Sequence, residues 1–211
     1  MDFVERLNWR YAVKKFDADK KLTKEQLDTI LESVRLSPSA NGLQPYRLIL
    51  VEAPEVRQAL AEHSFTNRDK IIGASNLLVF AIESKADGST VDRAISLISK
   101  VRGIPRSDLA GLEGMLSGVV ERFADSGDFQ NWARRQAYLA LGSLLTVCAG
   151  LGIDACPMEG FVPARYDEIL GLQEKGLTTA VIAVLGQRAA DDAYGKLKKV
   201  RRPMEDFLIR Y

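Results

Sequence analysis

The sequence predicts a single domain in which helices cover both faces of a central β-sheet. Two patterns lead to this prediction. Short, nearly uncharged runs such as 46–51 and 76–82 alternate with longer segments whose apolar residues recur at helical spacing. Strands that lack a polar side are typical of a sheet covered on both faces. The length of 211 residues, with 46% hydrophobic and 27% charged residues, suits one globular domain spanning residues 1–211.

The expected elements have recognisable starts and stops. Thr23 and Gln26 form a capping box at the start of the first helix. Its apolar stripe continues as far as Val34, and Pro38 ends it. The further elements expected along the chain are a strand at 46–51, a helix at 54–64, a strand at 76–82, a helix at 92–101, a helix at 129–149 and a strand at 178–185. Residues 103–128 contain five glycines and receive no assignment.

The helix expected at 129–149 lacks a polar side, because small and apolar residues surround it. A helix that is apolar all round is buried all round. In a chain of this size, packing against a second copy is the simplest way to bury such a helix on every side. The sequence therefore predicts a homodimer.

Two basic segments lie near opposite ends of a chain whose formal net charge is only +1. RYAVKKF at 10–16 contains three cations and no carboxylate, and KLKKVRRP at 196–203 contains five cations. The balanced total charge argues against a general nucleic-acid binder, which carries a basic excess over a whole face. The two segments are either two solvated surfaces or two halves of one site for a local anion, such as a phosphate group.

Several catalytic classes lack their usual residues. His63 is the only histidine, which leaves little room for a histidine-based nucleophile or metal site. It is expected near the end of a helix, in a structural role. The sequence contains no glycine-rich loop of the P-loop type, and Gly150 and Gly152 are expected to terminate the long helix. A chain with so few nucleophilic groups is expected to rely on a bound cofactor.

Cellular context is predicted from the cysteines and from hydrophobic runs. Cys148 and Cys156 match no disulfide framework and no zinc or redox motif, so both are expected to be reduced core residues. No run approaches the roughly 20 apolar residues that span a bilayer. The first nine residues, MDFVERLNW, do not resemble a signal peptide. We therefore expect a cytoplasmic protein that binds no membrane.

Four segments together resemble the FMN-dependent nitroreductase family. They are RYAVKKFD at 10–17, SPSANGLQPY at 37–46, PMEGF at 157–161 and KKVRRP at 198–203. Their order and spacing fit over almost the whole chain, with 103–130 unmatched. The resemblance implies an α+β fold with a central mixed β-sheet flanked by helices. It also implies a homodimer with a domain-swapped C-terminal segment and with FMN bound between the subunits.

The resemblance further implies which residues bind FMN. Those assigned to the phosphate, or to the motif that carries it, are Arg10, Tyr11, Ala12, Lys14, Lys199 and Arg201. Those assigned to the ring are Pro38, Ser39 and Asn41 from the loop of the partner subunit, Asn67 at the pyrimidine edge, Lys70 beside N1 and O2, and Pro157, Met158, Glu159 and Gly160 near N5. Phe123 would cover the electron acceptor, with a core position as the alternative. No side chain is assigned as a general acid, and no metal is expected.

Three positions depart from the family pattern. Ala12 stands where many members have a hydroxyl residue, Ala40 alters the loop beside Asn41, and Tyr46 replaces a frequent Trp. These differences leave the FMN assignment in place and put the range of acceptors in doubt.

The implied activity is that of an NAD(P)H-dependent flavoprotein oxidoreductase of the nitroreductase or quinone reductase type. It would reduce quinones or nitroaromatics in two half-reactions at one site, by hydride transfer through flavin N5. One alternative keeps the fold and changes the acceptor, as in a flavin, pteridine or enal reductase or a dehalogenase. Another is a flavin-binding protein without turnover. The choice between NADH and NADPH is left open, because the sequence shows no Rossmann-type ribose site.

Overall fold

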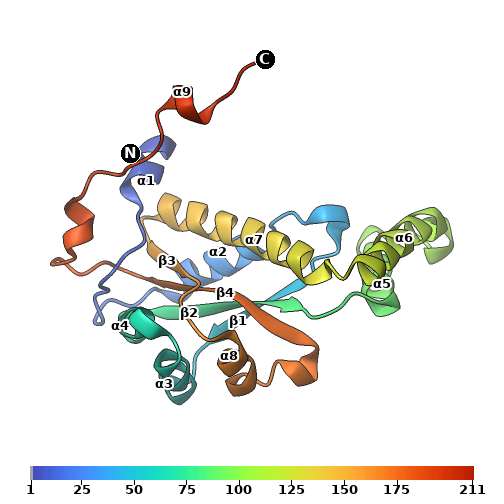
Figure 1. Cartoon of the computed structure of the whole chain (residues 1–211), viewed down its shortest axis with the longest axis horizontal. Coiled ribbons are helices and arrows are strands. Elements are labelled where there is room, and N and C mark those ends of the chain that lie inside the picture. Colours follow the sequence, from blue (N-terminus) through green and yellow to red (C-terminus); the bar gives the residue numbers. More distant parts are fainter. Residues whose placement is uncertain (1) are drawn as a thin grey trace.

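The fold is α+β, with one four-stranded sheet between two layers of helices (Figure 1). The computed structural model describes residues 2–211. Its strands are β1 (Tyr46–Val51), β2 (Asn76–Glu83), β3 (Asp154–Met158) and β4 (Leu177–Gly186). Its helices are α1 (Phe3–Trp9), α2 (Lys24–Arg35), α3 (Pro54–Glu62), α4 (Arg68–Gly73), α5 (Gly88–Arg102), α6 (Ala110–Ser126), α7 (Phe129–Leu151), α8 (Pro163–Ile169) and α9 (Met204–Phe207). The predicted α+β class is confirmed.

The sheet has the order β1-β2-β4-β3, and each adjacent pair of strands is antiparallel. This corrects the expected mixed sheet for the described residues, whose parallel pairing is limited to an isolated bridge between Ala12 and Ala155. The connection through α3 and α4 explains why β1 and β2 are antiparallel. Val51 at the end of β1 pairs with Leu77 near the start of β2, so the connection leaves and re-enters the same end of the sheet.

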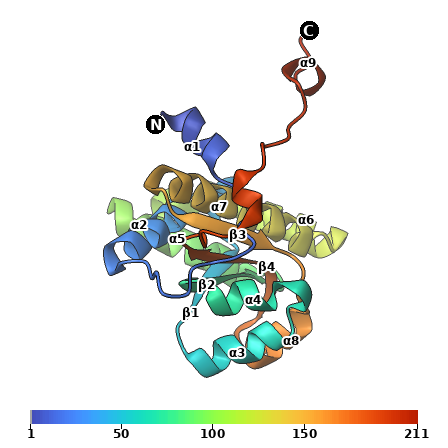
Figure 2. The same ribbon diagram turned by 90° about the vertical axis from the view of Figure 1, so that its left-hand side faces the viewer.

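Strand β2 shows why its sequence is apolar without alternation. Phe80 belongs to the cluster formed with α2 and α7, whereas Val79 belongs to the cluster formed with α3, α4 and α8. Both side chains are fully buried. Figures 1 and 2 show α2 and α7 on one face of the sheet and α3, α4 and α8 on the other. The sheet is therefore covered on both faces, as predicted.

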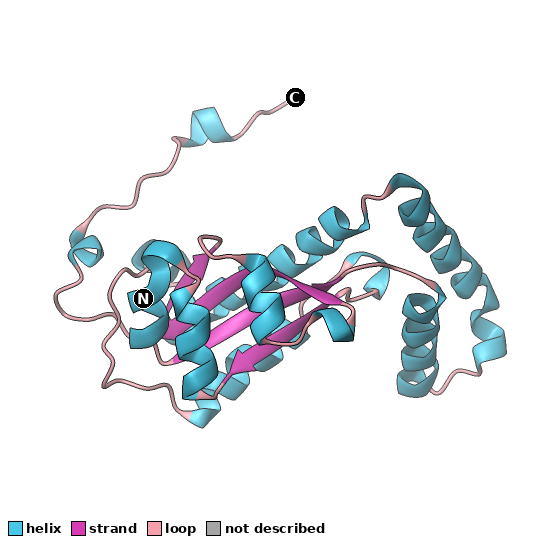
Figure 3. Cartoon of the chain, turned by 60° about the horizontal axis from the view of Figure 1, so that its bottom comes forward, coloured by secondary structure: helices cyan, strands magenta, loops and turns pink. Residues whose placement is uncertain are grey.

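Helices α5 and α6 lie at one end of the sheet and form a third apolar cluster. Figure 3 shows this pair set apart from the other layers. Helix α6 lies within the segment 103–128, which received no assignment, and it contains three glycines, at 111, 114 and 118. Each glycine lowers helix propensity by about 1 kcal/mol relative to Ala, which hides the helical pattern.

Helix α7 is buried on one side only in the single chain, so its expected burial on all sides through a second copy stays a prediction. Ala137, Ala140 and Leu144 are fully buried against the sheet. On the opposite side Tyr138 is 39% exposed and Leu139 is 51% exposed. The helix ends at Gly152, whose positive φ of 69° suits glycine, while Gly150 lies inside the helix rather than at its end.

The C-terminal segment 200–211 is exposed along its whole length. Figures 1 and 2 show it extending away from the sheet, with the short helix α9 near its end. Its exposed apolar side chains are Val200, Met204, Phe207, Leu208, Ile209 and Tyr211. An extended segment with this many exposed apolar groups is typical of an arm that packs on another chain.

Candidate functional site

The two basic segments meet beside α1. The ammonium of Lys199 donates a hydrogen bond to the backbone carbonyl of Leu7 at 2.6 Å and another to the backbone carbonyl of Arg10. Burial lowers the pKa of Lys199, and the positive charges of Arg10 and Arg201 lower it further. Burial and the charge of Arg201 also lower the pKa of Arg10. Three cations therefore lie close enough to repel one another.

This group of three, Arg10, Lys199 and Arg201, is called here the cation cluster. None of its members forms an ion pair with another residue in the described part of the chain. Neighbouring cations without a carboxylate destabilise the protein that holds them, unless an anion binds between them. The structure thus brings parts of the two basic segments together, an arrangement that suits an anion.

The N-terminal motif is held in place by Arg188. The central carbon of its guanidinium lies 4.2 Å from the ring centre of Trp9 and 4.4 Å from that of Tyr11, so it forms a cation–π contact with each ring. The same guanidinium forms hydrogen-bonded ion pairs with Asp154, at 2.9 Å from Nε to Oδ1. Asp154 begins β3 and is only 4% exposed. Arg188 thus fixes the residues on either side of Arg10 to the edge of the sheet.

Tyr11 is placed inside the fold. Its hydroxyl is buried near the carboxylate of Asp192 and forms no hydrogen bond of regular geometry among the described residues. It lies against Gly195, where a Cβ atom would come within 2.9 Å of the hydroxyl oxygen. Burial and the nearby carboxylates raise the pKa of Tyr11 to about 12, against the opposing charge of Arg188. The side chain packs beneath the segment that leads to the cation cluster. A direct contact of Tyr11 with a ligand stays a prediction.

Lys14 is positioned by Asp192. The carboxylate of Asp192 accepts hydrogen bonds from the backbone N–H of Lys14 at 2.8 Å, of Lys15 at 3.1 Å and of Tyr194 at 3.0 Å. The ammonium of Lys14 lies 5.5 Å from the centre of the Tyr194 ring. The neighbouring Lys15 pairs with Asp191 at the surface.

Lys70 belongs to a second group with Asn67 and Gly160. Its ammonium donates to Asn67 Oδ1 at 2.8 Å and to the carbonyl of Thr66 at 3.0 Å. The Asn67 amide in turn donates to the carbonyl of Gly160 at 2.8 Å. A Cβ atom at Gly160 would lie 2.7 Å from Asn67 Nδ2, so this approach requires glycine. The resemblance assigned these three residues to one site, and the structure brings them together.

Arg57 holds the helix that carries Lys70. From α3 it donates to the carbonyls of Ile71 at 2.8 Å, Ala74 at 2.7 Å and Ser75 at 3.0 Å. These carbonyls lie at the C-terminal end of α4 and just beyond it. Burial lowers the pKa of Arg57, which remains a cation. A short helix of six residues is thereby fixed in position with its lysine.

Strand β3 lies between the two groups of cations. Burial raises the pKa of the Cys156 thiol, and the positive charges of Lys14 and Lys70 oppose this rise. Both lysines are therefore near the middle of β3, although both come much earlier in the sequence. Cys148 is also buried and unreactive, with a pKa raised to about 12 by burial and by Asp154. The prediction of two free, buried core thiols is confirmed.

The segment after β3 contacts α7. Pro157 and Met158 end the strand, and Met158 is buried. Glu159 accepts a hydrogen bond from the hydroxyl of Tyr138. The backbone N–H of Phe161 donates to the carbonyl of Glu159 at 2.9 Å and closes a tight turn. The predicted residues of this segment therefore run from the end of β3 to Gly160, which lies beside Asn67.

The loop that contains Pro38, Ser39 and Asn41 contacts α7. The backbone N–H of Ala40 donates to Gln136 of α7 at 2.9 Å. Gln136 and Tyr138 are two positions apart, and at 3.6 residues per turn they point to opposite sides of the helix. No hydrogen bond or ion pair among residues 2–211 joins this loop to Lys70 or to the cation cluster. One subunit therefore does not bring all the predicted site residues together.

The contacts of Phe123 are with other aromatic residues. Its ring lies 4.9 Å from Trp132 and 5.6 Å from Phe129, measured between centres, in an aromatic group at the start of α7. It is half-buried, packed against the main core. Within one subunit Phe123 thus has the core contacts of the alternative interpretation. Its role toward an acceptor stays a prediction.

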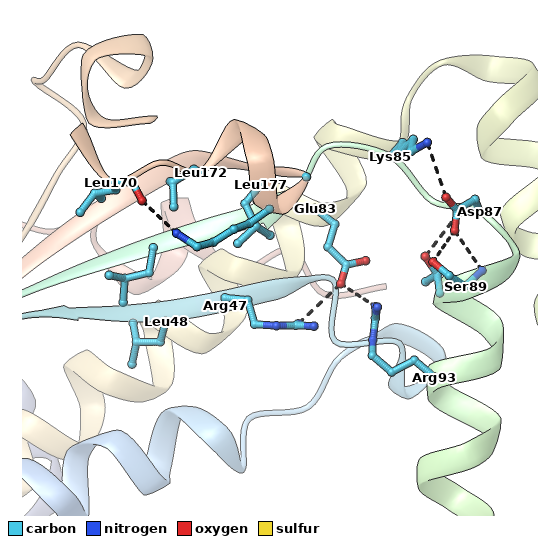
Figure 4. Close-up of a pocket in the computed structure, with 14 residues that line it drawn as sticks. Arg47, Leu48, Glu83, Lys85, Asp87, Ser89, Arg93, Leu170, Leu172 and Leu177 are labelled. Atoms are coloured by element: carbon cyan, nitrogen blue, oxygen red, sulfur yellow. Dashed lines mark hydrogen bonds and ion pairs between the residues drawn. The ribbon is translucent and has the colours of Figure 1, made fainter. Parts of the chain in front are cut away.

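A pocket of about 680 Å³ opens at another place, beside the start of β1 (Figure 4). Glu83 lies on its wall and binds Arg93 at 2.5 Å and Arg47 at 3.5 Å. Apolar side chains, among them Leu48 and Leu172, form the rest of the wall. None of the residues assigned to FMN lines this pocket.

Two further features of the described residues bear on function. Residues 2–211 contain no group of three or more His, Cys, Asp or Glu side chains arranged to hold a metal ion. Among the helices that the structure describes, none is long and apolar enough to cross a membrane. His63 follows the last residue of α3, which confirms its predicted place at a helix end.

Sequence reasoning missed four residues that organise this site, namely Tyr138, Asp154, Arg188 and Asp192. Each acts through a partner distant in sequence, for example 34 residues away for Arg188 and 178 for Asp192. None of them belongs to a short motif with a recognisable spacing. Signals of this kind become visible only when the chain is folded.

Comparison with known proteins supports one family. Residues 7–187 match the model described as the nitroreductase family. The chain is 31% identical over 215 residues to an oxygen-insensitive NAD(P)H nitroreductase of Salmonella typhimurium, and 99% of each chain is covered. Its fold resembles a nitroreductase-type protein of Exiguobacterium sibiricum solved in complex with FMN, with a TM-score of 0.83, 20% identity and coverage of 100% and 98%. It also resembles CLA-ER, an enone reductase, with a TM-score of 0.80, 20% identity and coverage of 99% and 97%.

Proposed function

The chain belongs to the nitroreductase family, and we propose that it is an FMN-dependent oxidoreductase that uses NADH or NADPH to reduce quinones or nitroaromatics. The observation that carries the proposal is the cation cluster, in which Arg10, Lys199 and Arg201 converge without an ion-pair partner in the described chain. A phosphate group is the kind of anion that such a cluster fits.

The residues present fit the phosphate of FMN. Lys199 uses two of its three N–H groups on backbone carbonyls, so one remains for a ligand oxygen. The guanidinium of Arg10 can offer two parallel N–H groups to a phosphate. Lys14 follows the Ala12–Ala155 bridge by two residues, with its ammonium beside the Tyr194 ring, and would add a further contact to the phosphate. The missing hydroxyl at Ala12 removes one contact from this set.

The second group of residues fits the ring of the same cofactor. FMN, when bound, supplies the hydride relay between the nicotinamide and the acceptor. Lys70 keeps one N–H after its two hydrogen bonds to Thr66 and Asn67, and its charge is held rigidly at that place. A fixed positive charge favours the extra negative charge that a flavin gains on reduction. Asn67 and Gly160 hold Lys70 and the backbone after β3 in one unit.

We propose a homodimer as the active form. The exposed side of α7 includes Leu139 and the small residues Gly142 and Gly150, which allow close approach of a second helix. Pairing of two α7 helices would carry the loop at 38–41 of one subunit toward the other subunit's Lys70, and so complete the predicted site. The arm at 200–211 would pack on the partner, and the unpaired edge of β1 is a place where it could add a strand.

The acceptor is proposed to be a flat electrophile. Tyr46, one of the positions that depart from the family pattern, is 9% exposed and lies in the core, so it does not itself contact a substrate within one subunit. The fold is shared with an enone reductase, which keeps α,β-unsaturated carbonyl compounds as a second class of acceptor. Both classes are flat electrophiles that can stack on a flavin.

Anaerobic spectroscopy tests the proposed function. The purified protein should be yellow, and the flavin that it releases on denaturation should be FMN. NADH or NADPH should bleach the bound flavin, and menadione, a nitroaromatic or an enone should restore its colour. A flavin that stays oxidised under excess NADH and excess NADPH would instead indicate a binding protein without turnover.

A further inference from the structure

Tyr138 and Glu159 form a contact that the proposed function does not yet use. The Tyr138 hydroxyl donates to the Glu159 carboxylate across 21 positions of sequence. We propose that Tyr138 is a positioning residue of the flavin site, which holds Glu159 and so fixes the backbone of residues 158–160 from the side of α7. This inference rests on the proposed function, because it assigns that backbone to the flavin.

The backbone of residues 158–160 is held from two sides. On one side the Asn67 amide donates to the carbonyl of Gly160 at 2.8 Å, and Asn67 is in turn held by Lys70. On the other side Tyr138 binds the side chain of Glu159. Met158 is buried, so the segment is anchored at its start as well. Removal of the Tyr138 hydroxyl would leave the Glu159 end of this segment without the hydrogen bond that ties it to α7.

The surroundings of Tyr138 keep its hydroxyl a donor. Burial and the hydrogen bond to Glu159 raise the pKa of Tyr138 to about 12, and the nearby positive charge of Arg134 opposes the rise only in part. The phenol is therefore protonated throughout the physiological range. It faces the exposed side of α7, at 39% exposure, rather than the core. Its hydroxyl is thus used for a polar contact and contributes little to core packing.

The hydrogen bond also affects the charge that a flavin would meet. A donated hydrogen bond partly neutralises a carboxylate. Without it, Glu159 would place a fuller negative charge beside the ring and disfavour reduction. Loss of the carboxylate itself would have the opposite effect. Tyr138→Phe should therefore lower the two-electron potential of the bound flavin, whereas Glu159→Gln should raise it.

Three variants and one control test the inference, namely Tyr138→Phe, Glu159→Gln, the double variant and Tyr166→Phe. Tyr166 is fully buried and its hydroxyl bonds Ser64 at 2.8 Å, so its loss weakens the fold through a different contact. The potential of bound FMN, the rate of reduction by NAD(P)H and the melting temperature of the apoprotein are measured for each. The apoprotein measurement reports the Tyr138–Glu159 coupling without any flavin.

The expected pattern is specific. Tyr138→Phe should lower the potential and slow flavin reduction by about tenfold, which corresponds to about 1.4 kcal/mol. The same change made in the Glu159→Gln background should have a much smaller effect on the potential, because its action depends on the carboxylate. Tyr166→Phe should lower the melting temperature and leave the potential unchanged.

Two failures can be told apart. If the wild-type protein holds no FMN, or NAD(P)H does not reduce it, the proposed function is wrong. If the wild type binds and reduces FMN normally and Tyr138→Phe shares its potential and its reduction rate, the inference alone is overturned. Equal effects of Tyr138→Phe in both backgrounds would likewise overturn it, since Tyr138 would then act without Glu159.

Discussion

Lys199 donates a hydrogen bond to the backbone carbonyl of Arg10, a residue 189 positions earlier in the chain. This contact joins the two basic segments and brings the positive charge of Lys199 close to the guanidinium of Arg10. The pKa of each group is lowered by burial first and then by neighbouring cations. Binding of an anion between these cations would therefore stabilise this part of the fold.

The close contact at Gly160 predicts an effect of a single methyl group. In Gly160→Ala the new Cβ would lie 2.7 Å from Asn67 Nδ2, so the hydrogen bond between them must lengthen or break. We expect a loss of about 1–3 kcal/mol in the free energy of unfolding, together with weaker FMN retention. Chemical denaturation and flavin content after dialysis measure the two effects.

Gly114→Ala is the matched control for that change. Gly114 lies inside α6 with open space around its missing Cβ, so Ala should raise the free energy of unfolding by about 0.5–1 kcal/mol. If Gly160→Ala proves as harmless as Gly114→Ala, the described packing of Asn67 on Gly160 is incorrect.

The fixed charge of Lys70 predicts a change in redox potential. Two unit charges about 4 Å apart at an effective dielectric constant of ~20 interact by ~4 kcal/mol, before desolvation reduces the gain. Lys70→Met should lower the two-electron potential of FMN by at least about 30 mV, which corresponds to about 1.4 kcal/mol. FMN should remain bound through its phosphate. Spectroelectrochemical titration gives the potential.

Lys24→Met serves as the control for charge removal at a distance. Lys24 pairs with Asp28 on the surface of α2, and its side chain is 88% exposed. Its loss should leave the potential unchanged. An unchanged potential in Lys70→Met as well would show that Lys70 does not lie beside the ring.

The lowered pKa of Asp192 predicts that the stability contributed by this carboxylate is lost in acid. Burial opposes the ionisation of this carboxyl, yet the hydrogen bonds from the backbone of Lys14, Lys15 and Tyr194 outweigh it and lower its pKa below the ordinary 3.8. A lowered pKa contributes stability above the unfolded value, and this contribution is lost as the pH falls through the folded value. Asp192→Asn should therefore lower the melting temperature at about pH 6 and much less at about pH 3.

Thermal melts of both proteins across this range test the sign. The difference between wild type and Asp192→Asn should shrink as the pH falls below about 4. A difference that stays constant with pH would mean that the charge of Asp192 does not support the backbone of Lys14.

The exposed side of α7 predicts dimer formation. Leu139 is 51% exposed in the single chain, and Leu139→Glu would place a charge in the proposed interface. Sedimentation velocity should show a dimer for the wild type and a shift toward monomer for the variant. Val101→Glu, at a 74% exposed position of α5, should leave the dimer intact. A wild type that sediments as a monomer with FMN bound would contradict the proposed composite site.

The elements that could be predicted from the sequence are those whose periodicity determines them locally. The strand at 46–51 was predicted with its observed bounds, and the capping box of Thr23 was confirmed by hydrogen bonds to and from Gln26. Strand β3 was missed because it has only five residues and contains Pro157, which resembles a loop. Helix α6 was missed because its glycines obscure helical propensity.

The site residues also divide into those that could be predicted from the sequence and those that only the folded chain reveals. The resemblance supplied Lys70, Asn67 and Gly160, and the structure joins them by hydrogen bonds. Arg188 and Tyr138 could not be predicted, because their roles depend on partners brought close only by the fold. The loop at 38–41 was predicted from the resemblance to contact the flavin of the partner subunit. A single chain cannot show that contact, because the loop has no bond to Lys70 of its own subunit.

The most direct test of the central claim is the ratio of the dissociation constants of riboflavin and FMN for the apoprotein, measured by quenching of flavin fluorescence. The two ligands differ only by the phosphate. Charge-assisted hydrogen bonds contribute about 1.5–3 kcal/mol each, so FMN should bind at least about 100-fold more tightly than riboflavin. Lys199→Met should reduce this ratio by about tenfold or more, while loss of the exposed Lys198 should not. Equal binding of FMN and riboflavin by the wild type would show that the cation cluster is not a phosphate site.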